Sequence, residues 1–195
     1  MRIFLAVNLS SAVKKSLAEL QNKIKNSFPM EFQDKVAKWV APVNLHLTLL
    51  FLGEVGEREI PQLVEIIQKV IQNQPPFALK MKNICYGPSI KLPPRLIWVG
   101  IKKNQRLEEI ANDLRDACSN ANISREMEGE FVGHITLARV KDWVWKRLEL
   151  EERPEIEKEF NLKIEVHSID LMESRLKRSA PEYVILQSFP LTGLE

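Results

Sequence analysis

The stretch Asn44-Leu45-His46-Leu47-Thr48-Leu49-Leu50 has a counterpart far downstream, Gly133-His134-Ile135-Thr136-Leu137-Ala138-Arg139, and both read His-x-Thr-Leu. In a β-strand, residues i and i+2 share one face and lie roughly 6.5 to 7 Å apart. Each copy would therefore present an imidazole and a hydroxyl on one side of a strand. The residues between them would point the other way, into apolar packing. Two such copies in one chain predict two related strands.

The segments around the two motifs follow a common order. In the first half, the apolar spacing predicts a strand at 3–7, a helix at 11–28, a short strand near 38–40, the motif strand at 45–52, a helix at 57–73, and strands at 77–86 and 96–101. In the second half it predicts a helix at 105–121, the motif strand at 131–140, a short helix or lid at 142–152, and strands at 160–171 and 183–189. The apolar parity slips within 77–86 and within 160–171, which indicates a bulge or a sharp twist in each.

A period this long with only two copies is typical of two related lobes rather than a solenoid. We expect an α+β fold in which residues 1–195 form a single bilobal domain, each lobe an antiparallel sheet with helices on its outer face. Packing the lobes around a pseudo-twofold axis would bring the two His-Thr pairs face to face across a central cleft.

The composition is that of an ordinary globular protein, with 195 residues, 45% of them hydrophobic and 28% charged. A formal charge of +2 is too small to indicate a nucleic-acid binder by charge alone, so an anionic ligand would have to be held locally.

Cys85 and Cys118 form no C-x-x-C pair and no zinc signature, and we interpret them as small core residues in a reducing compartment. The apolar run at 3–7 is too short for a signal peptide or a membrane span. We therefore expect a cytoplasmic protein with no membrane partner, and the sequence indicates no obligate protein partner.

Two imidazoles and two hydroxyls around one cleft suit a tetrahedral oxyanion. The hydroxyls would donate hydrogen bonds to non-bridging oxygens, while the imidazoles act on the entering and leaving oxygens. Because histidine has an ordinary pKa near 6.5, one ring can be a neutral base and the other a protonated acid near neutral pH. The pair of motifs therefore predicts in-line displacement at phosphorus.

Three further side chains near the second motif are candidates for binding. Arg139 lies on the opposite strand face from His134 in ideal geometry, so it would neutralise phosphate charge only if the strand ends or twists there, and is otherwise a solvated arginine. Trp143 and Trp145 would either stack on unpaired bases at the cleft mouth or pack inside a lid.

The remaining candidates are interpreted chiefly as structural. His167 lacks a Thr partner, and a metal site made from all three histidines is a weaker hypothesis than phosphate binding because the Thr residues serve phosphate better than metal. Trp39 and Trp98 are assigned to the core. Lys91, Arg95, Arg175, Lys177 and Arg178 are expected in loops, where they would line an RNA path or simply be solvated. No nucleotide-binding glycine motif occurs, which disfavours an ATP-driven ligase.

At nearly full length the chain resembles the RNA 2′,3′-cyclic phosphodiesterases, also called the 2′-5′ RNA ligase family, of the two-histidine phosphoesterase superfamily. The resemblance rests on the opening Arg2-Ile-Phe-Leu-Ala-Val, on Asn44-Leu-His-Leu-Thr-Leu-Leu-Phe-Leu-Gly-Glu-Val, on Gly133-His-Ile-Thr-Leu-Ala-Arg, and on Glu173-Ser174 with Tyr183. Gly133 stands where this family often has proline, and glycine loosens the backbone there.

The resemblance implies a bilobal α+β fold and hydrolysis of a 2′,3′-cyclic phosphate at an RNA end to a 2′-phosphate, with 2′-5′ joining as an associated activity. It implies no required metal and no cofactor. By position, His46 would be the proton donor to the leaving 3′ oxygen and His134 the proton acceptor that activates water. Thr48 and Thr136 would hold the phosphate.

Two alternatives remain open at the level of the sequence. In the first, the protein is an enzyme that hydrolyses another cyclic or 2′-5′-linked nucleotide. In the second, it is an RNA-end binding module with little catalysis. The presence of both His with both Thr favours an enzyme over the binding module.

Overall fold

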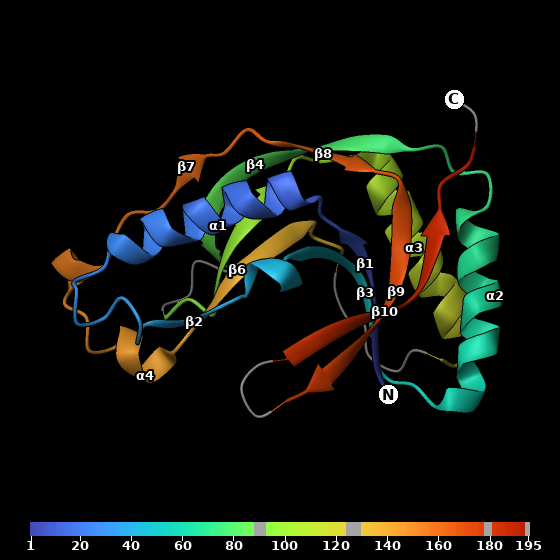
Figure 1. Cartoon of the computed structure of the whole chain (residues 1–195), viewed down its shortest axis with the longest axis horizontal. Helices are drawn as coiled ribbons and strands as arrows, with labels where there is room; N and C mark the ends of the chain where they lie inside the picture. The colour runs from blue at the N-terminus through green and yellow to red at the C-terminus, as the bar shows by residue number, and fades with distance from the viewer. Residues whose placement is uncertain (88–92, 124–129, 178–180, 194–195) are drawn as a thin grey trace.

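The computed structural model describes residues 1–87, 93–123, 130–177 and 181–193, which form a mixed α+β fold (Figure 1). The elements run in the order β1 (Arg2–Asn8), α1 (Ser11–Asn26), β2 (Ala37–Trp39), η1 (Pro42–Asn44), β3 (His46–Glu54), η2 (Glu57–Glu59), α2 (Ile60–Ile71), β4 (Phe77–Gly87), β5 (Leu96–Ile101), α3 (Gln105–Asn120), β6 (His134–Val140), α4 (Asp142–Trp145), η3 (Leu150–Glu152), β7 (Lys158–Glu159), β8 (Lys163–Val166), β9 (Ser168–Leu176) and β10 (Pro181–Pro190). The η elements are 3-10 turns.

The strands form one antiparallel sheet whose two motif strands meet at its centre. The order is β10-β9-β1-β3-β6-β5-β4-β7, with β2 also on β6 and β8 also on β4. Within the described chain, β3 and β6 pair at a single position, Leu47 opposite Ile135. This seam divides the sheet into a first lobe (β1, β3, β9, β10) and a second lobe (β2, β4 to β8). The expected two-lobed α+β architecture is confirmed.

The lobes are interleaved in the sequence, which corrects one expectation. Residues 160–171 are not one bulged strand, because β8 pairs with β4 in the second lobe while β9 pairs with β1 in the first. The apolar parity changes at His167 because the chain crosses there from one lobe to the other. By contrast, the slip expected within 77–86 is a true irregularity, a register shift between Met81 and Ile84 where β4 pairs with β5.

Two of the described helices, α1 and α3, begin directly after a capping side chain. The Ser10 hydroxyl accepts a hydrogen bond from the Val13 backbone N–H, and the Asn104 side chain accepts one from Leu107, so α1 and α3 each start with a satisfied cap. Helix α1 lies against β6, to which the Gln21 side chain bonds it, while α2 and α3 pack together at the other end of the sheet (Figure 1). Among the described residues, no helix is long and apolar enough to cross a membrane.

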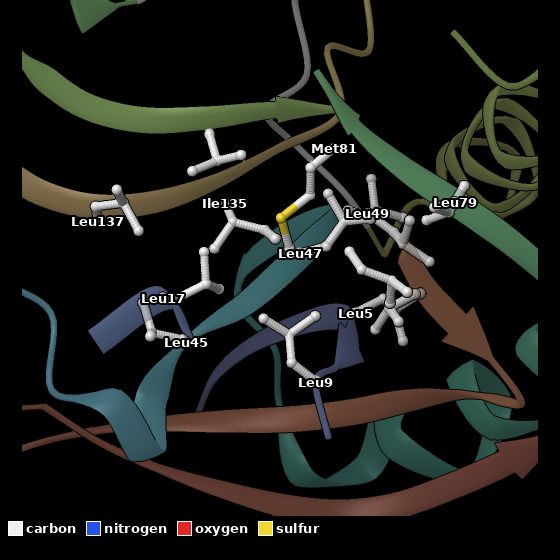
Figure 2. Close-up of a cluster of buried hydrophobic side chains, with 14 of the residues drawn as sticks. Leu5, Leu9, Leu17, Leu45, Leu47, Leu49, Leu79, Met81, Ile135 and Leu137 are labelled. Carbon is white, nitrogen blue, oxygen red and sulfur yellow. The ribbon is translucent and has the colours of Figure 1, made fainter. Parts of the chain in front are cut away.

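The core passes directly beneath the seam. Leu47 and Ile135, the middle residues of the two motifs, are fully buried and lie in one cluster with Leu17 from α1 and Met81 from β4 (Figure 2). Burying such a side chain contributes about 1.5 to 3 kcal/mol relative to leaving it exposed. The apolar residues of the motifs thus join the two lobes, and the alternation of the strands leaves the His and Thr side chains on the opposite face.

Candidate active site

One cavity lies over the seam, and the four polar residues of the two motifs line it: His46, Thr48, His134 and Thr136. The antiparallel pairing of Leu47 with Ile135 sets their arrangement. In that register His46 lies toward Thr136, and Thr48 lies toward His134. The structure therefore brings the two His-Thr pairs together around one space, as the pseudo-twofold arrangement requires.

Both imidazoles are anchored in the same way. The Nδ1 atom of His46 lies 2.7 Å from the carbonyl oxygen of Asn44, and that of His134 lies 2.8 Å from the carbonyl oxygen of Val132. A carbonyl only accepts hydrogen bonds, so Nδ1 must carry the proton in both rings. The neutral form of each ring therefore has its lone pair on Nε2, the atom available for proton transfer.

The two Nε2 atoms differ in their partners. Nε2 of His46 lies 3.0 Å from the Thr48 hydroxyl, which donates to it when the ring is neutral. Nε2 of His134 has no hydrogen-bond partner among the described residues. The pseudo-symmetry of the site is therefore broken at the atoms that would move protons.

The environment favours neutral imidazoles. Burial lowers the pKa of His46, the hydrogen bond to Asn44 partly offsets this, and the positive charges of Lys14, His134 and Arg139 lower it further. Burial also lowers the pKa of His134, again with an offset from its backbone hydrogen bond and a further lowering by Arg139. A bound anion would act in the opposite direction on both rings.

A β-bulge places Arg139 in the cavity. In the pairing of β5 with β6, Ile97 lies opposite Ala138 and Trp98 opposite Thr136, so Leu137 is an extra residue. Leu137 and Ala138 are consequently both buried, and the strand parity shifts by one. Arg139 then returns to the face of His134 and lines the cavity. The sequence allowed Arg139 to bind phosphate only if the strand ended or twisted before it, and this bulge provides that change of direction.

The buried side chain of Gln21 supports this bulge from α1. Its Nε2 atom donates hydrogen bonds to the carbonyl oxygens of Leu137 and Val40, each at 2.8 Å. The Val40 backbone N–H donates to the same Leu137 carbonyl at 2.9 Å. The carbonyl oxygen of the extra residue Leu137 is therefore satisfied by two donors.

The first motif carries a matching bulge that places Phe51 in the cavity. Leu5 lies opposite Leu50 and Ala6 opposite Thr48, so Leu49 is the extra residue and both leucines are buried. Phe51 thus occupies the position after His46 that Arg139 occupies after His134. Its side chain is 42% exposed, which leaves a ring face open to a ligand. Aligning the two motifs and noting the paired apolar residues Leu49-Leu50 and Leu137-Ala138 would have identified Phe51 from the sequence.

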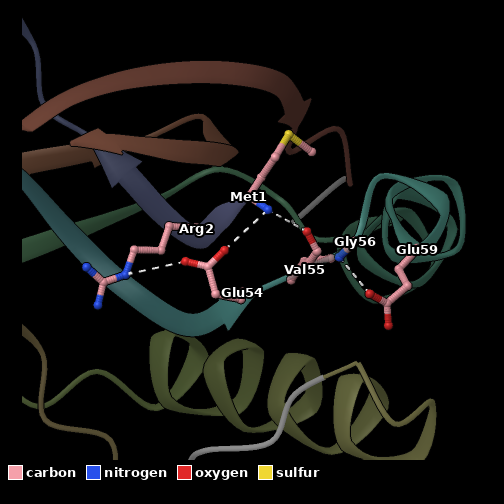
Figure 3. Close-up of polar contacts among 6 residues, drawn as sticks. All are labelled: Met1, Arg2, Glu54, Val55, Gly56 and Glu59. Carbon is pink, nitrogen blue, oxygen red and sulfur yellow. Dashed lines mark hydrogen bonds and ion pairs between the residues drawn. The ribbon is translucent and has the colours of Figure 1, made fainter. Parts of the chain in front are cut away.

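Aromatic rings form the wall of the cavity beside His46. Phe4 and Tyr183 each have a ring centroid within 5.2 Å of the imidazole, and Phe4 is 6.4 Å from Phe51. The guanidinium carbon of Arg2 lies 5.9 Å from the centre of the Phe51 ring. Arg2 is held in turn by Glu54, which also pairs with the Met1 nitrogen at 3.4 Å (Figure 3). One side of the cavity is thus cationic at Arg139, and the other is aromatic.

The β9–β10 hairpin closes the aromatic side of the cavity. Ser174 on β9 and Tyr183 on β10 both line it. The Asn44 side chain, which also lines it, donates to the Pro181 carbonyl at 2.9 Å. The sequence assigned these residues no role in the site, because their positions depend on which strands become neighbours.

The two candidate stacking tryptophans lie outside the cavity. Trp145 is 3% exposed and packs against Phe28, Tyr86 and Arg153, so its ring is part of the core and the stacking expectation for it is wrong. Trp143 is 61% exposed but is not among the residues that line the cavity. A stacking role for Trp143 stays a prediction.

The other candidates take structural positions. His167 is exposed between β8 and β9 and does not belong to the described lining of the cavity, so the three histidines are not brought together. Trp39 is half-buried against the core, and Cys118 is fully buried.

Of the cations expected in loops, Arg95 and Lys177 lie outside the helices and strands as expected, whereas Arg175 does not. Arg175 lies within β9 and pairs with Glu173 at 2.7 Å, and Lys177 pairs with Glu182 at 2.7 Å. Arg95 lies beside a second cavity that Arg139 also lines. Lys91 and Arg178 fall outside the described residues.

Comparison with known proteins defines the class. The family model described as LigT-like phosphoesterase matches the chain twice, over residues 7–98 and 99–183, with one motif in each match. The chain therefore belongs to the LigT-like phosphoesterases.

Three similar proteins each match at least 98% of this chain. An RNA 2′,3′-cyclic phosphodiesterase of Thermotoga maritima is 32% identical over 99% of this chain and 97% of its own length. The crystal structure of TT0787 of Thermus thermophilus matches all of both chains with a TM-score of 0.82 at 29% identity. Escherichia coli LigT complexed with 3′-AMP matches 98% of both chains with a TM-score of 0.78 at 27% identity.

Proposed function

We propose that the protein hydrolyses 2′,3′-cyclic phosphate ends of RNA to 2′-phosphates. The observation that carries this proposal is that two His-x-Thr motifs, one from each lobe, line a single cavity with both Nδ1 atoms tied to backbone carbonyls. That arrangement leaves two Nε2 atoms to serve the entering and leaving oxygens of one phosphorus. The name of the Thermotoga maritima relative and the 3′-AMP bound to Escherichia coli LigT support a nucleotide phosphate as the ligand.

The reaction requires one proton to enter and one to leave. His134 accepts a proton from water at Nε2 as the water oxygen forms its bond to phosphorus. The bond between phosphorus and O3′ breaks, and protonated His46 donates its Nε2 proton to O3′. The products are a 2′-phosphate and a free 3′-hydroxyl. Each proton transfer is typically worth about 10² to 10⁴ in rate.

The assignment of acid and base follows the asymmetry of the site. Nε2 of His134 is free of protein partners among the described residues, which suits an atom that must meet a water molecule. Burial and nearby cations lower the pKa of His46, which favours its neutral form in the empty site. The negative charge of the cyclic phosphate would raise that pKa when substrate binds, so His46 would become protonated and able to donate its proton.

The remaining lining residues would bind the substrate. The hydroxyls of Thr48 and Thr136 would donate to the non-bridging oxygens, and Arg139 would neutralise their charge. The exposed face of Phe51 would stack on the terminal base, since base–aromatic stacking is worth about 1 to 3 kcal/mol and tolerates any base. The ligand would then lie with its phosphate at the seam and its base toward the aromatic wall.

Three finer properties belong to the same proposal. No step above uses a metal ion or a cofactor, so hydrolysis should proceed in EDTA. If the 5′-hydroxyl of a second RNA replaced water, the same displacement would form a 2′-5′ linkage. The two free cysteines fit work in a reducing cytoplasm.

The decisive assay is incubation with an oligonucleotide that ends in a 2′,3′-cyclic phosphate, in the presence of EDTA. The expected product is a 2′-phosphate, and the same oligonucleotide ending in a 3′-phosphate should stay unchanged. A 3′-phosphate product, or a requirement for added metal, would contradict the proposal. Faster cleavage of a 2′-5′-linked dinucleotide would favour the alternative substrate class. Retained RNA-end binding without turnover would favour a binding module.

A further inference from the structure

The indole of Trp98 packs directly against His134. The two ring centroids are 4.3 Å apart with the planes inclined at 44°. On β5, Trp98 lies opposite Thr136, while Gly100 lies opposite His134 and offers no side chain there. The indole can therefore lean along the strand over the imidazole. Trp98 is not among the residues that line the cavity, so its contact is with His134 rather than with a ligand.

The indole is itself fixed on two further sides. Its Nε1–H donates to the Sγ atom of Cys85 on β4 at 2.8 Å. On the same strand, a Cβ added at Gly87 would lie only 2.5 Å from the indole. Only glycine at position 87 therefore leaves room for the ring. Trp98 is 9% exposed. The ring thus has little freedom to turn or to withdraw from His134.

His134 needs such a support more than His46 does. The carbonyl that anchors His134 belongs to Val132, an exposed residue outside any regular element, and the intervening Gly133 restricts the backbone little. The carbonyl that anchors His46 belongs to Asn44 in η1, which the Asn44–Pro181 bond ties to the β9–β10 hairpin. His46 also packs against both Phe4 and Tyr183, whose rings contact each other as well.

We propose that Trp98 is a positioning residue that sets the ring plane of His134, and so the direction of its Nε2 atom, for attack on the bound phosphate. This inference rests on the proposed function for its kinetic consequence, whereas the contact itself is independent of it. A core indole that only fills space would affect stability, but it would not act selectively on turnover.

The kinetic test compares Trp98→Leu with Trp98→Phe on the cyclic-phosphate oligonucleotide. Trp98→Leu should lower kcat by about 10- to 100-fold with KM within about twofold, because small misplacements of a catalytic group cost up to about 10²-fold. Trp98→Phe keeps an aromatic face and should recover most of the loss. Trp145→Leu, which removes a buried indole away from the cavity, is the matched control and should leave kcat within about twofold. Unchanged kcat in Trp98→Leu, or a loss that appears only in KM, would overturn the proposal.

The second test is spectroscopic and does not depend on turnover. A protonated imidazole in contact with an indole quenches its fluorescence, so the emission of Trp98 should fall as His134 takes up a proton on acidification. We expect this step in the otherwise native protein and in His46→Asn, and its absence in His134→Asn and in Trp98→Phe. Persistence of the step in His134→Asn would overturn the proposed contact. If the fluorescence of Trp98 falls on acidification but the oligonucleotide is not hydrolysed, the proposed function is wrong and the contact between Trp98 and His134 is still supported.

Discussion

Removing the charge of Arg139 should weaken substrate binding and shift the pH dependence of the reaction. Within the described ranges Arg139 forms no ion pair with a carboxylate, so its charge is free for an anion. A hydrogen bond to a charged group contributes about 1.5 to 3 kcal/mol. Because Arg139 is exposed at the rim of the cavity, solvent screening reduces this to about 1 to 2 kcal/mol. Arg139→Gln should therefore lower kcat/KM by about 5- to 30-fold.

The sign of the pH shift follows from the same charge. Arg139 lowers the pKa of both His46 and His134, so its removal should raise both values. Both limbs of the pH profile of kcat/KM should then move to higher pH. Steady-state kinetics across the pH range would measure both effects, with Arg58→Gln, an exposed arginine outside the cavity, as the matched control. An unchanged kcat/KM, or limbs that move to lower pH, would refute the placement of this charge beside the reacting phosphate.

Two further outcomes follow from the site and from the seam. The alkaline limb of kcat/KM should lie below about pH 6.5, since His46 must be protonated and its pKa in the free enzyme is lowered. The alkaline limb of kcat should lie at higher pH, because the bound phosphate raises the pKa of His46. If the alkaline limbs of kcat and kcat/KM coincided, the proposed protonation of His46 on substrate binding would be contradicted. Leu47→Ala should cost about 2 to 5 kcal/mol in urea unfolding, because this fully buried side chain lies at the joint between the lobes. Both lobes should unfold in one transition, and separate transitions for the two lobes would contradict a shared core.

Much of the fold was predictable because it is encoded locally. Helix α1 begins at its serine cap and α3 at Asn104, and each apolar stripe is the buried face of its helix. The two motif strands are also local patterns, since the alternation alone separates His46 and Thr48 from Leu47. Their meeting in one cavity followed from the duplication.

The remaining features depend on which strands become neighbours, and periodicity does not encode this. The crossing at His167 looked like a bulge, because a change of lobe and a bulge produce the same change of parity. The bulge at Leu137, by contrast, gave no signal on its own, since two successive apolar residues also fit a strand buried on both faces. Trp98 was correctly assigned to the buried interior, but its contact with His134 requires the pairing of β5 with β6. The burial of Trp145 depends in the same way on Phe28, which is remote in the sequence.

The most direct test of the account is the combined effect of the two histidines on hydrolysis of the cyclic-phosphate oligonucleotide. His46→Asn and His134→Asn should each lower kcat by about 10²- to 10⁴-fold. His167 is exposed and lies outside the cavity, so His167→Asn should leave kcat unchanged. Because both rings serve one displacement, the double variant should be little slower than the slower single variant. Near-normal turnover in either single variant would contradict the claim that the two motifs form one catalytic site, and so would fully multiplying losses in the double variant.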